Sequence, residues 1–360
     1  NIHRREAKGR QMVLVLVTDE TGEKEDNVVN LELAIAEAKD AGCIVYTLGR
    51  EAVFGYPYAY MRWEHPGTGL PVDRGPETGF IEQLQTNGFR RRHDAFASGF
   101  GPYGQARIAR ETGGVFFMLP SLETSIVRGE NRRYELEAMR SYRPDLRSRA
   151  VLAEENLNSL MRTRINEVIA SLNPWNDAVR PHVELRIHFS PDPETFVKQA
   201  AEERAKSIRY VDYLVKAENV FSSEEMVYAR SQEPSRRWQA NYDLLHAQIL
   251  AYKVRNFEYA AYLDWFLKNP KVVPLTKEPN LRLVHWDITT RKETLTGELT
   301  DSMIAQSKVL FQKVIDEHPG TPWAARAQWE LRRGFGVHMV PHYRAPYRNY
   351  TGPPIPIPRL

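Results

Sequence analysis

The sequence QMVLVLVTDE, residues 11–20, decides how the first part of the chain is expected to fold. Residues 12–17 form an apolar run of strand length, and the polar residues after it end the strand. Such a run is typical of a strand buried on both faces, as in a parallel sheet covered by helices. Because exposed strands of this kind aggregate, we expect an upstream segment, another part of the chain or another subunit to cover it.

The residues that follow extend this strand to a βαβ unit. Residues 28–40 place apolar side chains at helical spacing, and Gly42 ends the predicted helix. The run CIVYTL, residues 43–48, predicts a second buried strand, reached by a right-handed crossover. After an interruption, residues 105–112 predict a short helix, and VFFML, residues 115–119, predicts a third strand.

The interruption, residues 50–104, is rich in glycine, proline and aromatic residues. Residues 58–64 and 70–74 predict a β-hairpin with a long turn. Its aromatic group is a candidate partner-binding surface, because Tyr and Trp are enriched at binding hot spots: Tyr56, Tyr58, Tyr60 and Trp63. Packing of the same rings against the sheet is the alternative.

Four pieces of this pattern, taken in order, resemble the second half of a von Willebrand factor type A (vWA) domain. They are Leu14–Glu20, Leu31–Cys43, Ile44–Gly49 and Ala106–Phe117. The resemblance implies a partial, Rossmann-like parallel α/β domain over residues 1–122, with the hairpin insertion at 50–104. The whole chain is also similar to multi-domain bacterial proteins, particularly planctomycete ones, that contain this domain.

The resemblance also implies a metal ligand. In the vWA family a divalent ion lies at the carboxyl ends of the strands, and Asp19 matches the Asp that follows the fourth strand. Asp19 is therefore a candidate Mg²⁺ ligand. The family's Asp-x-Ser-x-Ser motif does not occur in this chain, and Mg²⁺ usually takes about six oxygen ligands. An upstream segment would have to complete the site; otherwise Asp19 caps the turn after its strand.

The chain becomes mostly helical after Pro120. Helical periodicity covers residues 131–140, 146–172, 194–217, 236–267 and 301–334, with strand-like residues at 183–189 and 270–291. Residues 304–331 resemble one tetratricopeptide repeat (TPR), and residues 236–270, with a turn near Arg255–Asn256, resemble a degenerate second unit. A generic helical hairpin is the alternative. We therefore expect a helical connecting region at 123–230, a TPR-like region at 231–335 and a Pro-rich extended tail at 336–360.

The charge of the chain argues against one class of partner. Lys and Arg number 49 and Asp and Glu 46, a net charge of +3, which is too small an excess to indicate nucleic-acid binding. No apolar run approaches the roughly 20 residues that span a bilayer. The single cysteine, Cys43, excludes an internal disulfide and leaves the compartment open, whether cytoplasmic or extracytoplasmic.

Few residue patterns point to catalysis. His338 and His342 have a spacing that would bring them together on a helix, but Pro341 between them disfavours a helix and therefore a zinc site. Asp73, His93 and Asp94 in the insertion could form a carboxylate and histidine metal site; a solvated basic loop at Arg90–Arg92 is the alternative.

The sequence therefore predicts a non-enzymatic protein-interaction or scaffold protein, in which a vWA-like surface and a helical docking region bind protein partners. Mg²⁺ would assist binding if an upstream half completes the metal site. Two alternatives stay open: a metal-dependent enzyme or enzyme subunit with its site in the insertion, and a structural component of an envelope or large assembly.

Overall fold

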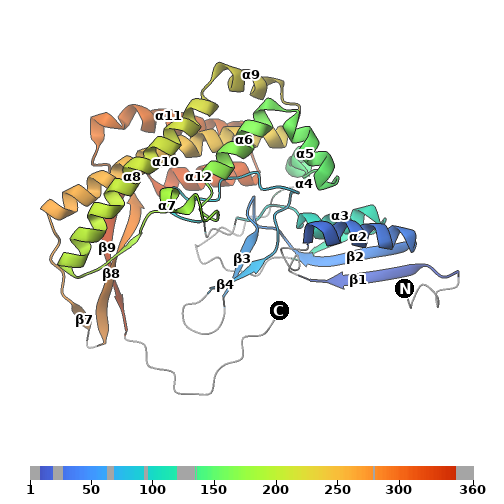
Figure 1. The fold of residues 1–360 in the computed structure, drawn as a ribbon, viewed down its shortest axis with the longest axis horizontal. Helices are drawn as coiled ribbons and strands as arrows, with labels where there is room; N and C mark the ends of the chain where they lie inside the picture. Colours follow the sequence, from blue (N-terminus) through green and yellow to red (C-terminus); the bar gives the residue numbers. More distant parts are fainter. Residues whose placement is uncertain are drawn as a thin grey trace.

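The computed structural model describes residues 9–18, 27–62, 69–92, 96–119, 134, 136–278 and 280–345. They form a mixed α/β structure in which a parallel sheet lies at one end of a larger helical body and an antiparallel sheet lies at the other (Figure 1). The predicted order, an α/β segment followed by a mostly helical region, is confirmed at this level.

The N-terminal sheet has three parallel strands in the order β1-β2-β5, in agreement with the three apolar runs. Its elements are β1 (Met12–Val17), α2 (Asn27–Asp40), β2 (Cys43–Arg50), α3 (Tyr103–Glu111) and β5 (Phe116–Leu119). Both crossovers lead in the same direction across the sheet, so right-handed connections place both helices on one face. Figure 1 shows α2 and α3 together on that side, and both contact β2.

The insertion between β2 and α3 contains the predicted hairpin. Its strands, β3 (Tyr58–Arg62) and β4 (Gly69–Asp73), pair in antiparallel fashion. Much of the remaining insertion is buried against the helical body, and the ring of Phe54 lies 4.8 Å from that of Trp323.

Arg92 shows that this part of the insertion is not a solvated basic loop. The residue is only 3% exposed, and its guanidinium donates to the carbonyl oxygens of Phe54 and Leu84. The expectation was wrong because irregular backbone that is buried needs donors for its carbonyl groups, and arginine supplies several from one side chain.

The helical body is built around α10 (Arg236–Lys268), which packs between α8 (Pro193–Phe221) and α11 (Asp301–Glu317). The other helices are α4 (Leu136–Met139), α5 (Arg149–Leu157), α6 (Leu160–Ser171), α7 (Arg180–Val183), α9 (Glu224–Gln232) and α12 (Pro322–Arg333). Short 3-10 turns cover Arg140–Tyr142 and Gly297–Leu299.

The turn predicted near Arg255–Asn256 does not exist, because both residues lie fully buried inside the continuous helix α10. Arg255 donates to the Glu330 carboxylate and to the Gly334 carbonyl oxygen, while Asn256 donates to the carbonyl oxygen of Gly88. The polar pair that suggested a turn therefore bonds two other segments across the core.

The hairpin of α11 and α12 agrees with the sequence pattern. Thr321 caps α12, where its hydroxyl accepts from the backbone N–H of Ala324, and Pro322 follows at the first position of the helix. Proline is favoured there because that N–H has no partner within the helix.

An antiparallel sheet closes the far side of the helical body. Its strands are β6 (His188–Phe189), β7 (Thr276–Glu278), β8 (Leu281–Arg291) and β9 (Gly336–Arg344), with β8 paired to all the others. Residues 336–344, expected in the extended tail, instead complete this sheet. They do so because Val337 and Met339 alternate toward the core, where both are fully buried.

The main apolar core joins the helices, the buried part of the insertion and the antiparallel sheet. Among the described residues, it contains none from β1, β2 or β5. The two ends of the molecule are therefore packed in different ways.

Candidate functional site

The face of the parallel sheet opposite α2 and α3 is apolar and open to solvent. Strand register places three sets of side chains on it: Val13, Val15 and Val17 of β1, Ile44, Tyr46 and Leu48 of β2, and Phe117 and Leu119 of β5. The rings of Tyr46 and Phe117 lie 6.2 Å apart, as expected for neighbours on one face. Val15 is 55% exposed and Phe117 49% exposed, although a parallel sheet is normally covered on both faces.

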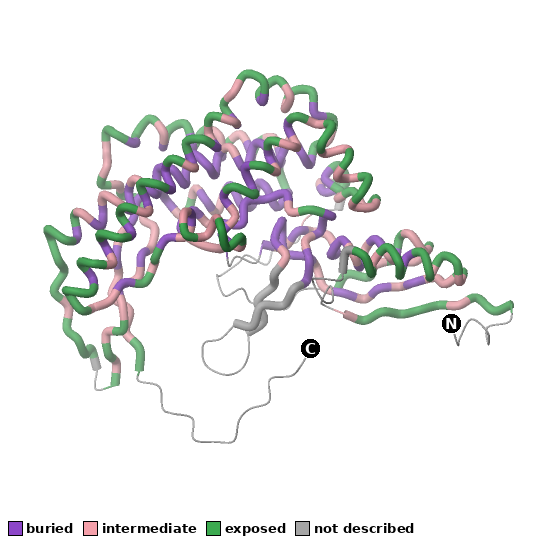
Figure 2. Tube along the Cα trace, in the orientation of Figure 1, coloured by how far each residue is buried: buried purple, intermediate pink, exposed green. Residues whose placement is uncertain are grey.

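The exposed surface continues around the outer edge of the sheet. In the part of the chain that the structure describes, β1 pairs only with β2, so its other edge has no neighbouring strand. Leu14 and Leu16 point to the helix-covered side and are still exposed, and so is Leu33 on α2. Figure 2 shows this strand as exposed along almost its whole length. We call the eight residues of the open face, together with this edge of β1, the open sheet surface.

This surface includes the strand for which the sequence predicted a cover. The run at residues 12–17 has the composition of a strand buried on both faces, yet five of its six residues are exposed. The open face carries one charged residue at its margin, Arg50, which pairs with Leu119 at the end of β2. Eight neighbouring apolar side chains that are exposed or half-buried on one face are typical of an interaction site.

The predicted site residues fall in different places. Asp19, the candidate Mg²⁺ ligand, lies outside the described residues, as do Trp63 and the side chains of Tyr58 and Tyr60. Tyr56 is fully buried, with its ring 6.3 Å from that of Trp175, so its prediction as a partner-binding residue is wrong.

The residues around Tyr56 show how it is buried. Its neighbour in sequence, Gly55, has a positive φ of 58°, a backbone conformation that glycine adopts readily. The guanidinium of Arg92 then lies 5.2 Å from the ring centroid of Tyr56 on the core side. The alternative metal site in the insertion is not described, because His93, Asp94 and the side chain of Asp73 all lie outside the described residues.

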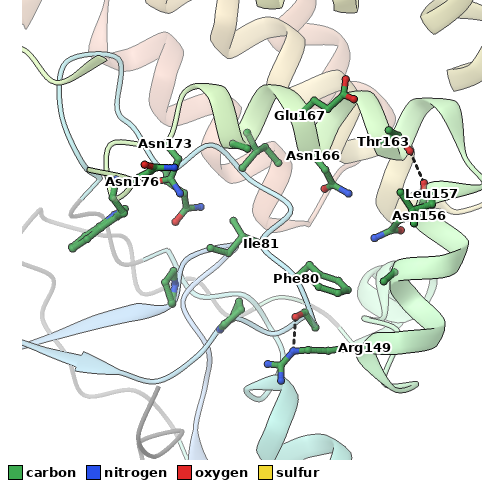
Figure 3. A pocket seen from close by; sticks show the side chains of 18 of the residues that line it. Phe80, Ile81, Arg149, Asn156, Leu157, Thr163, Asn166, Glu167, Asn173 and Asn176 are labelled. Carbon is green, nitrogen blue, oxygen red and sulfur yellow. Dashed lines mark hydrogen bonds between the residues drawn. The ribbon is translucent and has the colours of Figure 1, made fainter. Parts of the chain in front are cut away.

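A groove of about 1330 Å³ separates the insertion from helices α5 and α6 (Figure 3). Phe80 and Ile81 line it from the insertion, and Arg149 reaches across to donate to the Gly79 carbonyl oxygen at 2.8 Å. Amide side chains gather along the helical side: Asn156, Asn166, Asn173 and Asn176. Such a groove can hold an apolar group with a polar edge. No sequence motif marked it, because its walls come from segments far apart in the chain.

One polar cluster within the helical body has metal-ligand residues but a structural role. Ligand-type atoms of Asp243, Glu317 and His318 lie within 4.8 Å of one another. Arg230 already contacts both carboxylates at 2.5 Å, and Lys313 lies 3.2 Å from Asp243. The cations balance the carboxylates, so the cluster ties α9, α10 and α11 together.

The same cluster shifts the titration of its buried carboxyl group. Burial raises the pKa of Asp243, but hydrogen bonds from His318 and Arg230, with the nearby charge of Lys313, outweigh it and lower the pKa to about 2. The carboxylate is therefore ionised under ordinary conditions and belongs to the framework of the helical body.

Three comparisons with known proteins gave no match. No protein-family model, no curated protein and no solved structure matches it. Among the described residues, no helix has both the length and the apolar composition needed to cross a bilayer.

Proposed function

We propose that this chain is a non-enzymatic protein-interaction protein whose open sheet surface binds a partner protein. The partner adds a strand along the outer edge of β1 and covers the open face. The observation that carries the proposal is the state of β1, whose valines and leucines are exposed on both faces beside an edge with no neighbouring strand among the described residues.

The chemistry of the edge favours a polypeptide over other occupants. The free edge of a strand presents backbone N–H and C=O groups at regular spacing, and another strand pairs with all of them. A lipid surface could cover the apolar face, but it has no matching row of donors and acceptors. The partner segment is therefore expected to be an extended, mostly aliphatic strand, followed or preceded by a helix that packs on Val15, Tyr46 and Phe117.

The energetics are sufficient for a specific complex. Full burial of a Val, Leu or Phe side chain contributes about 1.5–3 kcal/mol. Association costs about 4–15 kcal/mol in lost freedom of motion. Half-exposed side chains such as Val13, Val15 and Leu119 gain only part of the full value, but several of them together with the strand ladder offset that cost.

Two finer parts of the proposal rest on resemblance. A partner that supplies the missing neighbour of β1 would complete a vWA-like sheet, and Asp19 would then be a ligand for Mg²⁺ at its carboxyl end. The helical body would serve as a scaffold or a second, TPR-like docking surface. Binding measured with Mg²⁺ and with a chelator, for wild type and Asp19→Ala, separates a Mg²⁺-assisted complex from one that needs only the sheet.

The first experiment replaces Val15 with a photo-crosslinking amino acid in the full chain, expressed in its natural host. The matched control places the same group at Val309, a 68% exposed residue on α11. We expect position 15 to crosslink to a strand-forming apolar segment of a different protein, and position 309 not to. The purified partner is then titrated with wild type, Val15→Lys and Val309→Lys. Val15→Lys should weaken binding more than tenfold, and Val309→Lys should have no effect.

Two outcomes would overturn the proposal. A crosslink from position 15 to the same position of a second copy, with a dimer in solution, would make the surface a self-association interface. Equal affinity of the partner for wild type and Val15→Lys would place the binding site elsewhere on the chain.

A further inference from the structure

The outer face of the antiparallel sheet carries an unusual group of histidines. In β8, Trp286 and Ile288 point to the core, so His285 and Asp287 alternate to the solvent side. In β6, Phe189 is fully buried and His188 takes the outer face, directly opposite Asp287. In β9, His342 lies opposite His285. Three strands therefore bring these imidazoles around one carboxylate.

The distances show that these four side chains form one connected cluster. The Nδ1 atom of His188 lies 2.5 Å, and the Nε2 atom of His285 lies 2.9 Å, from Oδ1 of Asp287. The other carboxylate oxygen, Oδ2, lies 3.2 Å from Nδ1 of His342. The rings of His285 and His342 stack, with centroids 4.6 Å apart and planes at 4°.

The two oxygens of Asp287 have different surroundings. Oδ1 faces the ring nitrogens of both His188 and His285, and these ligand atoms all lie within 4.8 Å of one another. Oδ2 can accept a hydrogen bond from His342 when its Nδ1 carries the proton. Carboxylates that bind metals in proteins are themselves held by hydrogen bonds, and His342 can hold Asp287 in this way.

We propose that His188, His285 and Asp287 bind a first-row transition-metal dication of the Zn²⁺ type, with His342 orienting the carboxylate. Imidazole nitrogen and carboxylate oxygen are the usual ligands of such ions. Two histidines with one carboxylate supply three ligands and leave further positions for water or another ligand. The side chain of His188 is 52% exposed, so the open positions face solvent.

Metal binding would change the contacts between the ligands. A metal binds the neutral imidazole. The ion would take the place of the hydrogen bonds that join His188 and His285 to Asp287. Because ligand atoms at about 2.0–2.2 Å from a tetrahedral ion lie about 3.4 Å apart, Nδ1 of His188 and Oδ1 of Asp287, which are 2.5 Å apart, would have to separate by about 0.9 Å.

This cluster differs from the polar cluster within the helical body in the feature that matters for metal binding. Asp243 and Glu317 each have a guanidinium against them, and Asp243 also contacts Lys313. Asp287 has three imidazoles, which become ligands or hydrogen-bond donors without carrying charge. Its place on the outer face also means that the core does not depend on it.

The test uses the full chain without a histidine tag, stripped with a chelator and titrated with ZnCl₂ by calorimetry. We expect one Zn²⁺ per chain at this site. His285→Ala and Asp287→Asn should each weaken Zn²⁺ binding at least as much as loss of an outer-shell partner, which typically costs about 10–100-fold. His342→Ala should weaken Zn²⁺ binding by about 10–100-fold. Co²⁺ in place of Zn²⁺ should give an absorption spectrum typical of nitrogen and oxygen ligands that disappears in His285→Ala.

The matched control is His338→Ala, which removes an imidazole from the same face of β9, beside Thr289. This variant should bind Zn²⁺ as wild type does. The proposal is overturned if wild type binds no stoichiometric Zn²⁺, or if His338→Ala weakens binding as much as His285→Ala. If His285→Ala fails to fold in the circular dichroism check, His188→Ala gives the same test, because His188 is half-exposed and needs no repacking.

Discussion

The parallel sheet and the helical body use similar residues in opposite ways. In the helical body, apolar side chains such as Trp323 are fully buried, and even arginine and glutamate are buried as pairs, as Arg255 and Glu330 are. In the parallel sheet, β1 is almost entirely aliphatic and yet exposed. The difference shows that an apolar composition alone does not tell whether a segment is buried in a core or exposed on a surface.

The first test of this comparison disrupts the buried charged cluster around Glu330 in the helical body. Glu330→Gln keeps the shape of the side chain but removes the charge that balances Arg255, Arg326 and Arg333. Removal of one member of a buried pair costs about 3–5 kcal/mol, because the other charge stays buried without a partner. We expect a loss of this size in the free energy of unfolding, measured by urea denaturation.

A matched control uses the same substitution at an exposed pair. Glu167 pairs with Arg164 on the surface of α6, so Glu167→Gln should cost less than about 0.5 kcal/mol. If the two variants lose similar free energies of unfolding, the buried cluster around Glu330 stabilises the helical body no more than an exposed ion pair does.

The second prediction concerns pH and the carboxylate of Asp243. Because its pKa is lowered to about 2 in the folded chain and is near 4 when unfolded, its stabilisation is complete above about pH 4. It is lost as the pH falls through 2, because the folded state must then accept a proton that the unfolded state already holds. A shift of this size corresponds to about 2 kcal/mol.

Asp243→Asn removes this titration. Between pH 5 and pH 2, we therefore expect the variant to lose about 2 kcal/mol less stability than wild type, as followed by urea denaturation at each pH. Parallel curves for the two proteins would show that the acid sensitivity of the body arises at other carboxylates.

Local patterns in the sequence predicted the parallel sheet well, because its strands are continuous apolar runs. Residues 12–17 and 43–48 become β1 and β2 in parallel register. The composition of β1 also predicts that this strand is covered, and this stays a prediction.

Long-range contacts could not be predicted in this way. Arg255 and Asn256 suggested a turn, but Arg255 contacts Glu330, which is 75 residues away. His188 and Asp287 are separated by 99 residues. The spacing of His338 and His342 would bring them together on a helix, but a strand also places both on one face, because alternate residues share a face. The alternation His285-Trp286-Asp287 was the available signal, because a core residue between two polar ones indicates a half-buried strand.

The smallest expected effect compares two valines of neighbouring strands. Val45 on β2 is 1% exposed beneath α3, so Val45→Ala should cost about 1–2 kcal/mol in local stability, seen as faster hydrogen exchange of the β2 amides. Val15 on β1 is 55% exposed. Val15→Ala should therefore change the local stability measured by hydrogen exchange by less than about 0.5 kcal/mol in the isolated chain.

The same two variants, Val15→Ala and Val45→Ala, also test whether a partner covers β1. In a complex that covers β1, Val15 becomes a buried residue, so the cost of Val15→Ala should rise toward that of Val45→Ala. The cost of Val45→Ala should stay unchanged, because its surroundings are already complete. If Val15→Ala has the same small effect with and without the partner, β1 tolerates exposure and is not the strand that the partner covers.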